Sequence, residues 1–223
     1  MLSRELPVCI FDAYGTLFDV HSAVAAHRGA FGDKADAVSA LWRQKQIEYS
    51  WLRSLMGAHA DFWQLTQDAL DYAMRAHGVD DAGLRAHLLD AYLTLRAYAD
   101  APACLRNLRE RGRRLGILSN GSPEMLARAV SSAGLDGIFE AVLSVESVKV
   151  FKTDPRVYAL VPAAFNVAPG QVCFVSSNAW DVAGAAHYGF EVVWINRLKL
   201  PPENLPGRAR AEIASLAELP ALL

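Results

Sequence analysis

Five short apolar runs constrain the fold of this chain more than any other feature of its sequence. They cover residues 8–11, 115–118, 141–145, 172–175 and 192–195. The runs do not alternate apolar with polar residues, which is typical of strands buried on both faces of a parallel sheet. Helix-like segments separate the last four runs. The sequence therefore predicts an α/β fold with a doubly wound parallel sheet.

The first two runs are separated by about a hundred residues, far more than one crossover helix needs. Residues 22–97 have helical spacing and very little strand character. We therefore expect a helical insertion between the first and second strands. The predicted division is a core of residues 1–18 and 99–223 and a helical cap subdomain of residues 19–98.

The composition excludes several classes of protein. Of 223 residues, 52% are hydrophobic and 21% charged, a globular balance that excludes a disordered or fibrous chain. The net charge of -2 provides neither a basic surface for nucleic acid nor a polybasic membrane anchor. The apolar runs are all shorter than the ~18 residues that a membrane-spanning helix requires. We expect no nucleic-acid partner and no membrane association.

The N-terminal segment and the cysteines indicate a compartment. Residues 1–7 contain a charge pair where a signal peptide would need an apolar core. The three cysteines, Cys9, Cys104 and Cys173, are far apart, and two of them lie inside apolar runs. Cysteines of this kind are typical of the core of a reduced protein. The sequence therefore predicts a cytoplasmic location.

Polar side chains follow four of the apolar runs, at the points where the predicted strands end. In open α/β sheets, ligands bind at the carboxyl ends of the strands. The polar residues at these points carry carboxylate, hydroxyl, amide and ammonium groups: Asp12, Ser119, Asn120, Glu146, Lys149, Lys152, Ser176, Ser177, Asn178 and Asp181. Their convergence predicts a binding or catalytic site along one edge of the sheet.

Several of these residues have a second explanation. Ser122, followed by proline, is typical of a helix N-cap, and the helix end behind it would suit an anion or would simply be capped. Asn178 and Asp181 have the spacing of a helix-capping pair. Lys152 precedes a helix start and could be solvated, and Lys149 is close enough to take its place.

Arg43 is in line with an apolar stripe in the insertion. Ile47, Trp51 and Leu55 follow it at intervals of four residues, which places all four on one face of a helix. A guanidinium group there either extends to water along its packed stem or meets an anion in an apolar pocket. The spacing leaves both explanations open.

Other catalytic motifs are missing from the sequence. The six histidines fall outside the strand ends, and neither an HExxH motif nor a Cys/His metal pattern occurs. There is no GxSxG elbow, P-loop or GxGxxG motif. The sequence therefore disfavours a histidine-based hydrolase and a nucleotide-binding fold.

Four segments identify a family resemblance. Residues 11–19, FDAYGTLFD, resemble the first motif of the haloacid dehalogenase superfamily. Residues 42–53, WRQKQIEYSWLR, resemble the cap helix of the L-2-haloacid dehalogenases (type II). Residues 118–121, LSNG, and 174–181, FVSSNAWD, resemble two later motifs of the same enzymes, in the expected order. The resemblance runs over essentially the whole chain.

The resemblance implies a fold and an activity. The fold would be a Rossmann-like core with an inserted helical cap, and the site would lie between the two. The activity would be hydrolysis of a short L-2-haloalkanoate to the D-2-hydroxyalkanoate and halide through an aspartyl ester. The resemblance also implies a homodimer.

Two positions differ from the phosphatases of the same superfamily. Phosphatases usually carry a second aspartate two residues after the nucleophile, where this chain has Tyr14. A halide leaves without a proton, so an acid there is dispensable. Phosphatases also place adjacent acidic residues in the last motif to hold magnesium, where this chain has Ser177 and Asn178. We therefore expect neither a metal nor another cofactor.

The resemblance also implies roles for the residues around the first strand. Asp12 would be the nucleophile that attacks C2 of the substrate. Thr16, Ser176 and Lys152 would hold its carboxylate, and the charge of Lys152 would keep it ionised. Tyr158 would be a supporting hydrogen-bonding residue. Thr153 stands where relatives often have proline, and Lys149 leaves a second candidate for the lysine.

The remaining roles concern the substrate and the water. Arg43 and Asn120 would receive the halide, and Ser119 would bind the substrate carboxylate together with nearby backbone amides. Asn178 and Asp181 would position and activate the hydrolytic water. The residues that contact the substrate or exclude bulk water would be Ala13, Tyr14, Gln44, Ile47, Phe62 and Trp180.

Two rival functions belong to different classes. A phosphatase or phosphonatase of the same superfamily is disfavoured by Tyr14 and by the missing acidic pair. A catalytically inactive binding protein is disfavoured because Asp12, Lys152 and Asp181 are all present. The sequence therefore favours a dehalogenase.

Overall fold

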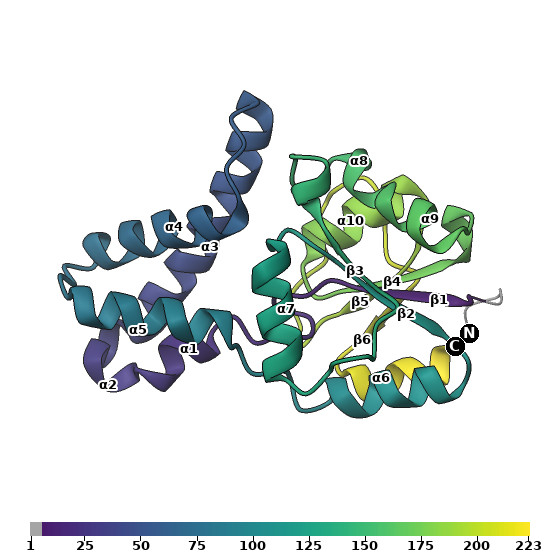
Figure 1. The fold of residues 1–223 in the computed structure, drawn as a ribbon, viewed down its shortest axis with the longest axis horizontal. Coiled ribbons are helices and arrows are strands. Elements are labelled where there is room, and N and C mark those ends of the chain that lie inside the picture. Colours follow the sequence, from purple (N-terminus) through teal and green to yellow (C-terminus); the bar gives the residue numbers. More distant parts are fainter. Residues whose placement is uncertain (1–5) are drawn as a thin grey trace.

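A six-stranded parallel sheet forms the centre of the molecule (Figure 1). The computed structural model describes residues 6–223, and the strand order is β3-β2-β1-β4-β5-β6. The strands are β1 Val8–Phe11, β2 Arg114–Ser119, β3 Ala141–Ser144, β4 Val172–Ser176, β5 Glu191–Ile195 and β6 Ala211–Ile213. The order reverses between β1 and β4, which makes the sheet doubly wound and confirms the predicted fold class.

The central strands are buried along their whole length, as their apolar sequences predict. Every residue of β1 and β4 is buried, because helices cover both faces of the sheet. The sequence did not indicate β6, which has three residues and pairs only with β5 at the edge. A strand this short carries too few residues to show a pattern.

Helices flank the sheet on both faces (Figure 1). On one side lie α6 (Ala101–Glu110) and α7 (Pro123–Ser132). On the other side lie α8 (Pro155–Tyr158), α9 (Leu160–Phe165) and α10 (Ala179–Tyr188), and α11 (Leu219–Leu222) packs against α6. The described residues also form 3-10 turns at Gly32–Lys34, Val145–Ser147, Pro169–Gln171 and Leu216–Glu218.

The insertion between β1 and β2 is helical, as expected. It contains α1 (Ser22–Ala26), α2 (Arg28–Phe31), α3 (Ala35–Met56), α4 (Phe62–Ala76) and α5 (Ala82–Leu93). Asp61 and Asp81 cap α4 and α5 by accepting backbone N–H groups. These helices form a separate body beside the sheet, from which the end of α3 projects (Figure 1). We call this body the cap; its division from the core at residues 18/19 and 98/99 stays a prediction.

Two adjacent segments connect the cap to the core. Phe18 and Ala97 form an antiparallel bridge. The Asp19 N–H donates to the carbonyl of Arg96, and the Tyr98 N–H donates to the carbonyl of Leu17, each at 2.9 Å. The outgoing and returning connections are therefore joined where they leave the core.

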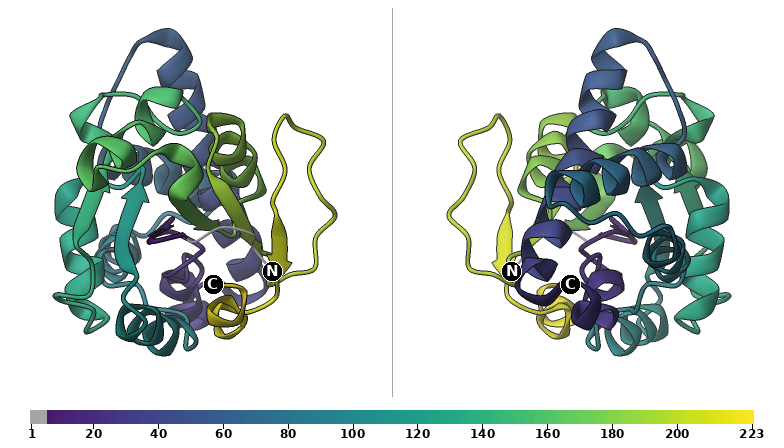
Figure 2. Two further views of the ribbon diagram at one scale, coloured as in Figure 1. Left: turned by 90° about the vertical axis from the view of Figure 1, so that its right-hand side faces the viewer. Right: turned by 90° about the vertical axis from the view of Figure 1, so that its left-hand side faces the viewer.

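The remaining predictions about the chain concern its cysteines, its loops and its N-terminus. Cys9, Cys104 and Cys173 are buried free thiols, as expected. The long loop between β5 and β6 extends away from the sheet (Figure 2). Within residues 6–223, none of the helices combines the length and apolar character needed to span a membrane. Most of the segment considered for a signal peptide, residues 1–5, lies outside the described residues.

Candidate active site

The candidate site lies where the strand order of the sheet reverses. Asp12 directly follows β1, and its N–H donates to the carbonyl of Val175 on β4 at 2.9 Å. Ser176 ends β4, and Ser119 ends β2. The reversal opens a crevice at the carboxyl ends of the strands. The sheet therefore brings together the polar residues that follow three of its strands.

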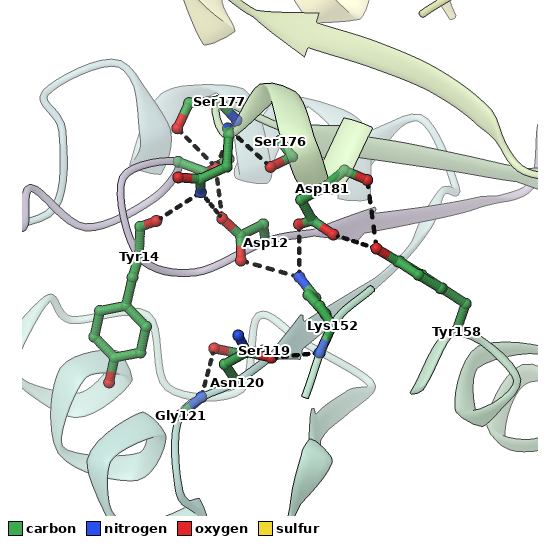
Figure 3. Close-up of polar contacts among 12 residues, drawn as sticks. Asp12, Tyr14, Ser119, Asn120, Gly121, Lys152, Tyr158, Ser176, Ser177 and Asp181 are labelled. Carbon is green, nitrogen blue, oxygen red and sulfur yellow. Dashed lines mark hydrogen bonds and ion pairs between the residues drawn. The ribbon is translucent and has the colours of Figure 1, made fainter. Parts of the chain in front are cut away.

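Three side chains donate to the Asp12 carboxylate (Figure 3). Lys152 Nζ lies 3.0 Å from Oδ1. Asn178 Nδ2 and Thr16 Oγ1 lie 2.7 and 3.1 Å from Oδ2. Asp12 is only 4% exposed, so these donors replace most of its hydration. The carboxylate is held in one orientation.

Lys152 also bonds a second carboxylate. Its Nζ lies 2.7 Å from Asp181 Oδ2, so the ammonium group bridges Asp12 and Asp181 (Figure 3). Burial lowers the pKa of Lys152, but the charges of Asp12 and Asp181 outweigh it, and its pKa is raised above the ordinary value. The buried lysine therefore stays charged.

Asp181 is fully buried, and its environment raises its pKa. Burial raises the pKa of Asp181 to about 6, against the opposing effect of the Lys152 charge. Tyr158 donates its hydroxyl to Asp181 Oδ1 at 2.8 Å. Burial and the Asp181 charge raise the pKa of Tyr158 well above its usual value, so this hydroxyl remains a donor. A carboxylate that titrates near pH 6 suits proton transfer at neutral pH.

The structure decides between the two candidate lysines. Lys149 has a side chain that is 65% exposed and pairs with Glu146 at 2.8 Å. Lys152 is buried, and its N–H donates to Asn120 Oδ1 at 3.0 Å. This backbone bond ties the segment after β3 to the end of β2. Lys152 is therefore the lysine that reaches Asp12.

The turn after Asp12 is fixed by Ser177, a polar strand-end residue for which no individual role was predicted. The Ser177 N–H donates to Thr16 Oγ1 at 2.8 Å, and that hydroxyl in turn donates to Asp12. Gly15 has a positive φ of 90°, and a Cβ there would lie 3.1 Å from Ser177 Oγ. Glycine therefore allows the turn to approach β4 closely.

Asn178 contacts the Asp12 carboxylate directly, and Ser176 contacts the backbone of Asn178. The Asn178 N–H donates to Ser176 Oγ at 3.1 Å, while the side chains of residues 6–223 that donate to Asp12 are Thr16, Lys152 and Asn178. A direct part for Ser176 in holding the carboxylate stays a prediction. Ser176 orients the loop from which Asn178 reaches Asp12. Asn178 occupies the N-cap position of α10, but its side chain makes no capping bond there. The capping explanation for Asn178 is excluded.

Arg43 reaches the core from helix α3 of the cap. Its Nη2 donates to the Tyr14 carbonyl at 3.2 Å and to Asn178 Oδ1 at 3.3 Å. Its Nη1 donates to Gln46 Oε1 at 2.8 Å. Gln46 also accepts from the buried hydroxyl of Tyr92 at 3.1 Å. The guanidinium group faces the site, and Gln46 and Tyr92, which the sequence analysis did not identify, hold it there.

Aromatic side chains enclose the site. Tyr14 and Phe62 are buried with ring centroids 6.0 Å apart, and Ile47 and Ala13 are buried as well. Trp180 meets Trp51 of the cap edge to face, with centroids 5.5 Å apart. Gln44 is exposed, and its place in the pocket wall stays a prediction.

Two buried polar atoms at the site have no hydrogen-bond partner within residues 6–223. They are Asn120 Nδ2 and the Tyr14 hydroxyl. Ser119 Oγ accepts the Gly121 N–H at 3.1 Å, which leaves its own proton free to donate. Burying an unpaired donor is costly. These donors are consistent with a site built for a polar or anionic ligand.

Ser122 caps α7 by accepting the Met125 N–H, which is the simpler of its two explanations. Within the described part of the chain, His, Cys, Asp and Glu side chains do not gather in threes as a metal site requires.

The fold and the site together define a Rossmann-like hydrolase with a helical cap and a buried Asp–Lys–Asp cluster. The chain belongs to the haloacid dehalogenase-like hydrolases, whose family model matches residues 6–189. The expected family is thereby confirmed.

The curated relatives share most of their length with this chain. The (S)-2-haloacid dehalogenase 4A of Burkholderia cepacia is 48% identical over 220 residues, 98% of this chain and 95% of the relative. The (S)-2-haloacid dehalogenase of Pseudomonas sp. (strain YL) is 51% identical over 207 residues, 92% of this chain and 89% of the relative.

A solved structure of similar fold carries a covalent ligand. It is the L-2-haloacid dehalogenase from Xanthobacter autotrophicus with chloropropionic acid covalently bound. Its TM-score is 0.90 at 39% identity, covering 97% of this chain and 98% of that chain.

The charge balance of the site predicts a pH-dependent loss of stability. Lys152→Met removes the ammonium group and leaves two buried carboxylates unpaired, which costs about 3–5 kcal/mol at neutral pH. The raised pKa of Asp181, about 6 with the lysine present, rises further without it. The deficit should therefore shrink as the pH falls from 8 towards 6, because Asp181 takes up its proton at a higher pH in the variant than in wild type, and it should change little below 6. Urea unfolding from pH 8 to pH 5 measures it.

Lys149→Met is the matched control. It removes an exposed lysine from a surface pair, which costs about 0–1 kcal/mol. A Lys152→Met protein as stable as wild type at neutral pH would contradict the assigned charge balance.

Proposed function

We propose that this protein is an L-2-haloacid dehalogenase, which hydrolyses short L-2-haloalkanoates to D-2-hydroxyalkanoates and halide. The bridging contact of Lys152 with Asp12 and Asp181 carries the proposal. This arrangement orients Asp12 as a nucleophile and places Asp181 nearby as a base. It provides no acid for the leaving group, and a halide needs none. The curated relatives support the substrate class by their names.

The first step is displacement of halide by Asp12. One carboxylate oxygen attacks C2 opposite the carbon–halogen bond, the halide leaves with the bonding electrons, and C2 inverts once. Thr16, Asn178 and Lys152 fix the carboxylate for this attack. Asp12 is only 4% exposed, so the carboxylate is poorly solvated and reactive.

Donors around the cavity match the two anions that must be held. Arg43 and the unpaired Nδ2 of Asn120 would receive the halide. The Ser119 hydroxyl and backbone N–H groups near Tyr14 would hold the substrate carboxylate. The aromatic rings of Tyr14 and Phe62 would contact the alkyl chain.

The second step is hydrolysis of the ester at its acyl carbon. Asp181 would take a proton from water as the water oxygen bonds to Cγ of Asp12. The bond between Cγ and the ester oxygen would then break, which restores the Asp12 carboxylate, and the product oxygen would take the proton back from Asp181. The C2–oxygen bond stays intact, which preserves the single inversion. Asn178 would orient the water, and Tyr158 holds Asp181 in place.

Metal independence belongs to the same proposal. Superfamily phosphatases hold magnesium with adjacent acidic residues where this chain has Ser177 and Asn178. Here Asn178 donates its side-chain amide to Asp12 at 2.7 Å, and Lys152 Nζ pairs with both Asp12 and Asp181. Tyr14 occupies the position of the phosphatase acid, where a halide needs none.

Oxygen labelling tests the covalent route. In a single turnover of L-2-chloropropionate in H₂¹⁸O with enzyme in excess, the label should enter Asp12 and not the new hydroxyl group. Ester hydrolysis at Cγ replaces one oxygen of Asp12 from solvent. Mass spectrometry of the peptide containing Asp12 and of the product provides the measurement.

The controls separate the parts of this proposal. D-2-chloropropionate should release no halide, and prolonged EDTA treatment should leave turnover unchanged. Label in the product hydroxyl alone would show that Asp12 acts as a general base. Activity lost with EDTA and restored by magnesium would support a phosphatase-like mechanism.

The raised pKa of Asp181 predicts the pH dependence of turnover. Only the ionised carboxylate accepts a proton, so ester hydrolysis should rise with pH through about 6 and fall below it. Asp181→Asn should release about one halide per site and then stop, because the ester forms but is not hydrolysed. Rapid-quench halide assays measure both effects. Steady turnover by Asp181→Asn would contradict the role of this residue.

We also propose that the protein is a cytoplasmic homodimer. The end of α3 projects beyond the core and exposes Trp51, Leu52, Leu55 and Met56, with Leu55 85% exposed (Figure 1). Adjacent exposed apolar side chains of this size favour association with a second copy. The buried free thiols suit a reducing compartment.

Sedimentation velocity tests the dimer. The mass obtained for wild type should be twice the 24.3 kDa mass of the chain. Leu55→Glu with Met56→Glu should sediment as a monomer, because each dimer would bury unpaired charges. Leu198→Glu is the control, since Leu198 is 76% exposed on the β5–β6 loop. A monomeric wild type, or a dimeric double variant, would contradict this proposal.

A further inference from the structure

Arg197 lies just behind the candidate active site, two residues after β5. Its guanidinium group bonds both oxygens of Asp100, with Nη1 2.7 Å from Oδ2 and Nη2 2.9 Å from Oδ1. Its Nη2 also donates to the backbone carbonyl of Thr16 at 3.3 Å. Through these bonds Arg197 connects the end of β5 to the turn that follows the nucleophile. The family resemblance implied no role for this arginine.

Asp100 is also held by several hydrogen bonds. Besides Arg197, it accepts the Ser215 hydroxyl at 2.7 Å and the Leu216 N–H at 2.9 Å. Burial raises the pKa of Asp100, but these hydrogen bonds outweigh it, and the pKa lies below its ordinary value. Asp100 occupies the N-cap position of α6, yet its side chain makes no capping bond. The carboxylate is directed to Arg197 instead.

Arg197 contacts both connections between cap and core. Its guanidinium carbon lies 4.0 Å from the centroid of the Tyr98 ring, on the returning connection next to Asp100. Thr16 lies on the outgoing connection. The arginine side chain is only 18% exposed. A single half-buried cation therefore joins both connections to the end of the sheet.

Thr16 links this cation to the nucleophile. Its carbonyl accepts from Arg197, and its hydroxyl donates to Asp12 Oδ2 at 3.1 Å while accepting the Ser177 N–H. A shift of the Thr16 backbone therefore moves the hydroxyl that orients the attacking carboxylate. A small displacement of a reacting group from its productive position lowers the rate of the chemical step strongly.

We propose that Arg197 is a positioning residue, which fixes the turn of residues 13–18 through the Thr16 carbonyl and so orients Asp12 for attack on the haloacid. This inference rests on the proposed function. Arg197 does not touch the reacting atoms; it acts through Thr16. Lysine cannot replace it fully, because one ammonium group cannot reproduce the planar bidentate contact with Asp100 and also reach Thr16.

Hydrogen exchange tests the positioning without reference to activity. Arg197→Met should speed exchange of the backbone amides in residues 13–18 and at Tyr98, and Arg197→Lys should do so less. Arg210→Met is the matched control, since Arg210 directly precedes β6, has an exposed side chain and pairs at 2.7 Å with Glu191 at the start of β5. It should leave exchange in residues 13–18 unchanged. Unchanged exchange in Arg197→Met would overturn the proposal.

A double-mutant cycle tests the route through Thr16. In the wild-type background, Arg197→Met should lower the single-turnover rate of ester formation by about 10- to 100-fold, with a smaller change in KM. In a Thr16→Val background, it should lower the rate by less than about twofold, because the hydroxyl it positions is gone. Arg210→Met should change neither rate.

The outcomes separate this inference from the proposed function. Losses that multiply in the double variant would show that Arg197 does not act through Thr16, even if wild type releases halide. A wild type that releases no halide from L-2-chloropropionate would contradict the proposed function, and hydrogen exchange would still decide the role of Arg197. If Arg197→Met does not fold, Arg197→Lys takes its place in the cycle with a smaller expected loss.

Discussion

The site depends on one buried ammonium group between two buried carboxylates. Asp12 and Asp181 could not both remain charged inside the protein without Lys152, because each would lose its hydration without a compensating partner. The three groups sum to a single negative charge. With this balance Asp12 can act as the nucleophile, while Asp181 has a pKa of about 6. Orientation and reactivity therefore have the same physical origin.

The fold makes this cluster possible by bringing distant segments to one edge. Asp12 follows β1, Asp181 lies in the first turn of α10 after β4, and Lys152 belongs to the segment after β3. Parallel strands end on the same side of a sheet, so each segment needs only a short polar loop to reach the others. The Lys152 backbone is held by Asn120 from the end of β2. All four strand ends thus contribute to the position of one lysine.

The sequence predicted the residues that carry charge or follow strands, and it could not predict their supports. Asp12 and Lys152 are recognisable because motif and strand position coincide. Ser177 and Gln46 are ordinary polar residues whose roles depend on partners far away in the chain, Thr16 for Ser177 and Tyr92 for Gln46. Ser176 was recognised, but its hydroxyl accepts the Asn178 N–H because a loop geometry decides which neighbour it meets. Such contacts follow from tertiary structure, and spacing along the chain does not encode them.

Contacts between cap and core limit access to the buried site. Asp12 and Lys152 are almost inaccessible, and separating these contacts would widen the path of a substrate to them. Arg43 to Tyr14, His59 to Glu146 at 3.1 Å, and Trp51 against Trp180 are among these contacts. Side-chain contacts of this kind are individually weak and can break without unfolding either body. The sheet keeps the Asp–Lys–Asp cluster assembled during such opening, because its members all belong to the core. Arg43 is the one charged site residue that belongs to the cap, so it would move away with the cap. The anion site would therefore be complete only when the cap lies against the core.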